Sequence, residues 1–242
     1  MSRLAIVAAL EREVRPLVKH WQVRKKEHAG REFRFYETRE AVLVCGGIGP
    51  EAARRAAEAV IVLYSPDLLF SVGYAGALDP ALKVGDLLMA AQVINGSDGS
   101  RVDVSKGQGI LLSQSAVASV AQKSRLREFY GAQAIDMEAS AVARAAEARG
   151  VRFRAIKVIS DEFNFELPAD GRFVDSEGRF RQARFALHAL VRPWLWLPLV
   201  HLAKNSARAT RSLCAELRKI VFQEIAVDSS PQSGSVDDEC GS

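Results

Sequence analysis

The alternation of short apolar runs with alanine-rich segments constrains the fold of this chain more than any other feature. Residues 4–10, 67–76 and 153–161 are almost uninterrupted in apolar side chains, which is typical of strands buried on both faces. Residues 49–64 and 137–150 lie between such runs and place apolar side chains at helical spacing. The pattern predicts an α/β fold, a three-layer α/β/α sandwich around a central mixed sheet.

The chain has 242 residues, of which 48% are hydrophobic and 26% charged, which suits a soluble globular protein with a full core. We expect one α/β domain over residues 1–190, followed by an amphipathic helical extension over residues 191–226. Residues 227–242 are polar and acidic, and their composition predicts a disordered tail.

Charge and cysteine usage exclude several classes of function. The net charge is +4, and the four acids of the tail leave about +8 on residues 1–226. The basic residues are dispersed without interleaved aromatics, so a solvated surface is favoured over nucleic-acid binding. The three cysteines lack CxxC spacing and the four histidines form no ligand pair, so we expect no metal and a reducing, cytoplasmic compartment.

Acids and glycines follow five of the predicted strands at the point where each strand ends. In open α/β sheets functional groups gather at the carboxyl ends of the strands. One such end would carry little weight, but five predict a common site. The five groups are Glu11 or Glu13, Gly46–Gly49, Gly73–Gly76, Asp136–Glu138 and Ser160–Asp161.

Each group also has a simpler interpretation when it is taken alone. Asp136 and Glu138 could be acids that complement a helix N-terminus, and Glu13 could be a solvated acid of a first helical turn. Ser160–Asp161 could be an ordinary helix cap. Residues 47–52 match GxGxxA, a weak indication of NAD(P) binding, but the next strand does not end in the acid that holds the ribose.

Taken together, the strand ends resemble those of the nucleoside phosphorylase/nucleosidase superfamily, most closely the 5′-methylthioadenosine/S-adenosylhomocysteine nucleosidases. The similarity spans about residues 3–165. It rests on residues 8–14, 46–53, 71–88, 135–143 and 156–162, with "LKVGDLL" and "DMEAS…ISD" as its most specific parts. The resemblance implies the three-layer fold, an active site at the strand ends, no cofactor and a homodimer.

The resemblance also implies roles for individual residues. Asp161 would protonate N7 of a departing adenine, and Glu13 would orient or deprotonate the attacking water. Glu138 would bind the ribose hydroxyls, with Met137 packed on the sugar. Lys157 stands where the family tends to have arginine and would steer Glu13 and the water. Asp136, in contrast, has no role that the resemblance implies.

Four further residues are expected to bind substrate because of their positions in the segments that match the family. Tyr74 departs from the nucleosidase pattern, in which a serine is usual, and this alters the expected shape of the pocket. The other residues of this group are Gly49, Gly76 and Ser160.

Three interpretations of the activity stay open. Family phosphorylases hold phosphate through an arginine before the glycine turn and a serine within it, where this chain has Ser71 and Tyr74. A dianionic phosphate is poorly held without such a cation, so water is favoured as the nucleophile. The alternatives are a phosphorylase of the same fold and a catalytically silent, membrane-associated nucleoside-binding module.

Two further departures concern the substrate's 5′ side. Only residues 95–108 lie where the family has some tens of residues, which predicts an open 5′ side. Residues 192–225 extend past the usual final helix and combine Trp194 and Trp196 with an apolar stripe and basic residues. They resemble hopanoid-associated members that release adenine from adenosylhopane. This extension either contacts a membrane surface peripherally or docks on protein.

Overall fold

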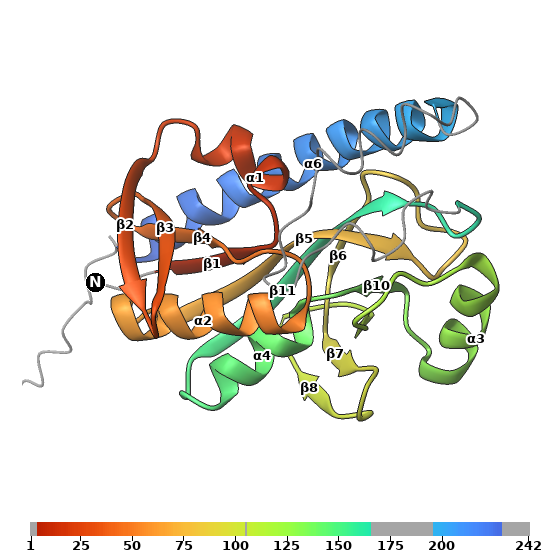
Figure 1. The fold of residues 1–242 in the computed structure, drawn as a ribbon, viewed down its shortest axis with the longest axis horizontal. Coiled ribbons are helices and arrows are strands. Elements are labelled where there is room, and N and C mark those ends of the chain that lie inside the picture. The colour runs from red at the N-terminus through yellow and green to blue at the C-terminus, as the bar shows by residue number, and fades with distance from the viewer. Residues whose placement is uncertain (1–3, 105, 166–195, 229–242) are drawn as a thin grey trace, which may run out of the picture.

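A computed structural model describes residues 4–104, 106–165 and 196–228 (Figure 1). Its elements are β1 (Leu4–Ala8), α1 (Glu11–Val18), β2 (Gln22–His28), β3 (Arg31–Glu37), β4 (Ala41–Cys45), α2 (Pro50–Tyr64), β5 (Leu68–Ala77), β6 (Leu87–Met89), β7 (Gln92–Asn95), β8 (Arg101–Asp103), β9 (Ile110–Ser113), α3 (Val120–Tyr130), β10 (Ala134–Asp136), α4 (Ala139–Glu147), β11 (Arg152–Asp161) and α6 (Trp196–Asp228).

The strands form one mixed sheet in which β5 is central. β1 lies parallel between β4 and β5, and Val7 is opposite both Val44 and Ser71. β11 runs parallel along the whole of β5, while β10 pairs antiparallel with its last residues, Gly76 and Ala77. The carboxyl ends of β1, β5 and β11 therefore meet at one edge of the sheet. The predicted mixed central sheet is confirmed.

Helices cover both faces of this sheet (Figure 1). On one face α2 and α4 pack small side chains such as Ala53, Ala57 and Val142 against β1 and β4. On the other face α1 and α6 pack Leu17 and Leu213 against the same strands. Small residues let the helix backbones approach the sheet closely, which explains the alanine-rich sequences. The three-layer α/β/α sandwich is confirmed.

The long helix α6 is the predicted amphipathic extension, and it docks on the core. Ala209, Leu213 and Leu217 are fully buried against α1 and the sheet, at the spacing of one helical stripe. Lys204 and Arg208 are exposed. Trp194, the boundary at residue 190 and residues 229–242 of the predicted tail lie outside the described residues. In the described part of the chain no helix is long and apolar enough to cross a membrane.

Three local features do not follow from the apolar pattern of the sequence. β2 has a charged and exposed sequence, QVRKKEH, as suits an edge strand that pairs only with β3. Residues 84–94 are mostly apolar but contribute to two strands, because β6 pairs with β11 and β7 pairs with β8 and β9. α3 begins at Val120, where Ser119 and Gln122 form a capping box.

Candidate active site

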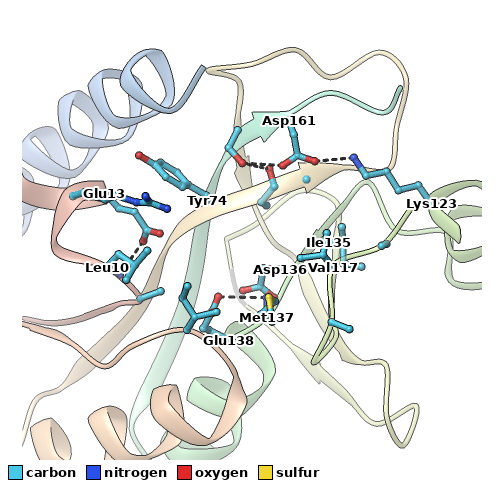
Figure 2. A pocket seen from close by; sticks show the side chains of 18 residues that line it. Leu10, Glu13, Tyr74, Val117, Lys123, Ile135, Asp136, Met137, Glu138 and Asp161 are labelled. Carbon is cyan, nitrogen blue, oxygen red and sulfur yellow. Dashed lines mark hydrogen bonds and ion pairs between the residues drawn. The ribbon is translucent and has the colours of Figure 1, made fainter. Parts of the chain in front are cut away.

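Four strand ends meet around one cavity of about 210 Å³ (Figure 2). It is lined by residues that follow β1, that end β5 and β11, and that join β10 to α4. The structure therefore brings most of the predicted strand-end groups together. The predicted residues that line the cavity are Glu13, Tyr74, Gly76, Asp136, Met137, Glu138, Ser160 and Asp161.

Glu13 reaches the cavity from the first turn of α1 and is buried there. Its carboxylate accepts a long hydrogen bond, of 3.5 Å, from the backbone N–H of Leu10. A Cβ at Gly73 of β5 would lie 2.7 Å from Oε2 of Glu13, and the φ of Gly73 is +141°. Only glycine suits this position. Glu11, the other acid of this turn, is half-exposed and pairs with Arg34 at 3.1 Å.

Glu138 faces the same cavity from the residue before α4. Its Oε1 accepts the N–H of Gly49 at 2.9 Å, and its Oε2 accepts the N–H of Met137 at 3.3 Å. The second glycine of the GxGxxA match therefore holds a carboxylate of the chain itself. Gly49 acts on Glu138 rather than lining the cavity.

Burial gives these two carboxyls unusual acidities. Desolvation, followed by repulsion from Glu138, raises the pKa of Glu13 to about 8. Desolvation, followed by repulsion from Asp136, raises the pKa of Glu138 to about 7. Both groups therefore exchange protons near neutral pH, and the protonation state of one glutamate affects the acidity of the other.

Asp136 and Lys157 form a fully buried ion pair behind these acids. Nζ of Lys157 lies 2.9 Å from Oδ2 of Asp136. The same oxygen accepts the N–H of Ala139 at 2.8 Å, so Asp136 also caps α4, as its simpler interpretation predicted. Ser113 donates to the other oxygen of Asp136. Burial opposes the charge of Lys157, but Asp136 and Glu138 outweigh it and raise the pKa of the lysine.

Asp161 is presented by an irregularity at the end of β11. The register with β5 shifts between Ile159 and Asp161, which places Asp161 opposite Gly76. A Cβ at Gly76 would lie 2.7 Å from Oδ2 of Asp161, so the glycine leaves room for the carboxylate. Ser160 donates from Oγ to Oδ1 of Asp161 at 2.9 Å. Gly76 and Ser160 thus position the acid.

Lys123 of α3 is the site residue that the sequence did not reveal. Its Nζ lies 2.7 Å from Oδ2 of Asp161, its side chain is 2% exposed, and it lines the cavity. In the sequence it is one of several basic residues in a polar helix, beside Arg125 and Arg127, which point outward. No local pattern separates the buried lysine from its exposed neighbours.

Tyr74 connects the cavity to α6. Its hydroxyl lies 2.6 Å from Oγ1 of Thr210 and donates to the carbonyl of Ser206 at 3.2 Å. Burial raises the pKa of Tyr74, so the hydroxyl stays neutral. The serine that is usual in the family would be too short to reach α6. The tyrosine of this chain can therefore contact the long helix, which a serine could not.

In the described ranges no group of three or more His, Cys, Asp or Glu is placed to hold a metal ion.

A model of the phosphorylase superfamily matches residues 3–110 and 107–194. The chain belongs to this superfamily. The predicted membership of the nucleoside phosphorylase/nucleosidase superfamily is confirmed, and with it the prediction that the chain is an enzyme.

A curated relative, the 5′-methylthioadenosine/S-adenosylhomocysteine nucleosidase of Staphylococcus aureus, is 27% identical over 201 residues, covering 67% of this chain and 88% of the relative. The structure of the Helicobacter pylori nucleosidase of that name, with butyl-thio-DADMe-Immucillin-A, aligns with a TM-score of 0.64 at 18% identity, over 93% of this chain and 99% of that one. Futalosine hydrolase of the same organism gives 0.59 at 20% identity, over 66% and 88%. At these identities the structures establish the fold.

Proposed function

We propose that this enzyme is a purine nucleosidase that hydrolyses the N-glycosidic bond of a 5′-substituted adenosine and releases adenine. One observation carries the proposal: the buried side chains of Glu13, Glu138 and Asp161 reach a single cavity from three different strand ends. Cleavage of an N-glycosidic bond passes through a cationic sugar, so it needs negative charge near C1′ and a proton donor at the leaving base.

The proposed reaction uses these groups in separate roles. As the bond between C1′ and N9 breaks, its electron pair moves into the adenine ring and Asp161 gives a proton to N7. Glu13 takes a proton from the water that attacks C1′. Glu138 accepts hydrogen bonds from the ribose hydroxyls, and Met137 packs on the sugar. Lys157 lies behind the two glutamates, where it pairs with Asp136 and partly offsets the negative charge of both glutamates.

Water is the proposed nucleophile, rather than phosphate. A phosphate dianion near Glu13 and Glu138 would meet carboxylates, and the lysines beside them already pair with Asp136 and Asp161. Ser71, the serine expected near a phosphate, is buried within β5 and does not line the cavity. The names of the curated relatives, which are nucleosidases, also support hydrolysis.

For the 5′ group we propose a large apolar substituent, such as that of a lipid-linked adenosine of the adenosylhopane kind. The short segment over residues 95–108 supports this proposal. Lys204, Arg208 and Arg211 also support it, because these exposed residues of α6 would suit an anionic membrane surface. Binding to vesicles with anionic lipid, against neutral vesicles, tests the membrane contact. Sedimentation tests the proposed homodimer.

The decisive experiment measures adenine release from methylthioadenosine, S-adenosylhomocysteine and a long-chain 5′-alkyl adenosine, with and without phosphate. We expect release without phosphate, fastest for the long-chain substrate, and loss of release in Asp161→Asn. Asp103→Asn, at an exposed aspartate of β8, is the matched control and should behave as wild type. Release that requires phosphate would replace the hydrolase by a phosphorylase. No release from any nucleoside would favour the silent binding module.

A further inference from the structure

The side of the cavity that holds Asp161 contains a second buried charge, the ammonium of Lys123. We infer that Lys123 is the proton source for Asp161, which passes that proton on to the leaving base. This inference rests on the proposed function and adds to it a positioning residue that supplies the acid. It also explains why a helix outside the matched strand ends places a lysine in the cavity.

The geometry provides a direct path for the proton. Nζ of Lys123 donates to Oδ2 of Asp161 at 2.7 Å and to the carbonyl of Glu162 at 3.1 Å. Ser160 donates its one hydroxyl proton to Oδ1 of Asp161 at 2.9 Å, and the same Oγ lies 3.4 Å from the carbonyl of Ala75. The ammonium and the carboxylate are each held on two sides, so their short contact is fixed rather than transient.

Other charged groups near this pair are engaged elsewhere. The Glu162 side chain pairs with Lys83 at 3.6 Å. On α3, Arg127 lies 3.4 Å from Asp79. Across the cavity, Lys157 forms an ion pair with Asp136. Lys123 and Asp161 are 2% and 5% exposed and therefore act as an isolated donor and acceptor, sheltered from water.

The proton balance of the step is simple. A proton moves from Nζ of Lys123 to the carboxylate of Asp161, which leaves a neutral amine and a neutral acid. The acid gives its proton to N7 while the electron pair of the broken bond enters the base. The pair then consists of an amine and a carboxylate, and solvent reprotonates the amine after the base leaves. A neutral amine is tolerated in a dry site, since desolvation favours the uncharged form of lysine.

This role differs from that of a fixed positive charge, and arginine separates the two. Arginine keeps the charge and the hydrogen bond but cannot give up its proton in a protein. If Lys123 only orients Asp161, Lys123→Arg should retain activity. If Lys123 supplies the proton, Lys123→Arg should lose about as much activity as Lys123→Met. We expect both variants to lower kcat for adenine release by about 100-fold.

Two further measurements distinguish catalysis from structure. A 5′-substituted riboside with 4-nitrophenolate as leaving group needs no protonation, so Lys123→Met should cleave it within about threefold of the wild-type rate. Added ethylamine should restore part of the activity of Lys123→Ala, whereas guanidinium should not.

Three outcomes would overturn the inference. They are a wild-type rate in Lys123→Arg, an equal loss on the nitrophenyl riboside, and a failure of ethylamine to restore any activity to Lys123→Ala. Far-ultraviolet circular dichroism of each variant checks that it is folded, and amine rescue gives a result even if arginine does not fit. If the wild-type protein cleaves neither type of substrate, the proposed function itself fails, and this result is distinct from a loss confined to the variants.

Discussion

The two sides of the cavity contain the same kind of ion pair but differ in what surrounds it. Lys157 and Asp136 meet at 2.9 Å on the side toward β10 and α4, and Lys123 and Asp161 meet at 2.7 Å on the side toward α3, all four deeply buried. Glu13 and Glu138 lie near the first pair, while among the described residues no second carboxylate contacts the second pair.

This difference in charge balance would suit the different chemistry that we propose for the two sides. Where three carboxyls share one buried ammonium, burial and Glu138 raise the pKa of Glu13 to about 8, so this group readily takes a proton. Where one carboxylate meets one ammonium, the charges balance, and in our proposal this pair supplies a proton. The same residue types would thus act as a base on one side and as an acid on the other.

The largest effect is expected from Glu13→Gln, which removes the proposed base. The amide cannot take a proton from water, so kcat should fall by about 1,000-fold. Steady-state adenine release at pH 8 measures this loss. Glu11→Gln is the matched control, since Glu11 belongs to the same helical turn but faces Arg34. Equal losses in both variants would mean that the fold of α1 was damaged, and no loss in Glu13→Gln would remove its assigned role.

Breaking each ion pair in turn should show directly that the two pairs contribute differently to stability. Lys157→Met leaves Asp136, Glu13 and Glu138 together without a buried cation, so we expect a loss of stability of about 3 kcal/mol, typical of a broken buried pair. Lys123→Met leaves a single carboxyl that no second carboxyl contacts, so this variant should lose less stability. Urea unfolding at pH 8 measures both. Equal losses would contradict the role given to the surplus carboxylates.

Much of this arrangement follows from the sequence because it depends on local patterns. Buried strands, alanine-rich helices and acids at strand ends all lie within short windows, so the layers and the positions of Glu13, Glu138 and Asp161 could be predicted. The small residues around the acids are equally informative, since Gly73 and Gly76 leave room for two carboxylates.

The remainder depends on contacts between distant parts of the chain. Lys123 lies 38 positions from Asp161, and nothing in its own helix marks it as buried. β2 is held by its pairing with β3 and has too polar a sequence to be recognised as a strand. Tyr74 could be noticed as a departure, but its partners, Ser206 and Thr210, are more than 130 positions away.

The pH dependence of stability should sharpen the contrast between the two sides. The folded protein holds a proton on Glu13 between pH 4.5, where an ordinary glutamate loses it, and about 8. The unfolded chain binds fewer protons there, so the free energy of unfolding should fall as pH rises through this window. Glu13→Gln removes that loss and should be about 5 kcal/mol more stable than wild type at pH 9, given about 1.4 kcal/mol for each pKa unit between 4.5 and about 8. Urea titrations at pH 5 and pH 9 check this, and a gap independent of pH would contradict it.

The smallest effect is expected where the cavity wall meets α6, away from both ion pairs. Thr210→Val removes the 2.6 Å partner of the Tyr74 hydroxyl and leaves only the carbonyl of Ser206. A net hydrogen bond of this kind contributes about 1 kcal/mol, so unfolding should be easier by that amount while kcat stays near wild type. A double-mutant cycle with Tyr74→Phe should give a coupling of about 0.5–1 kcal/mol, as expected for residues in contact. A large fall of kcat in Thr210→Val would instead place the docking of α6 within the catalytic arrangement, and the division between a chemical cavity and a supporting helix would no longer hold.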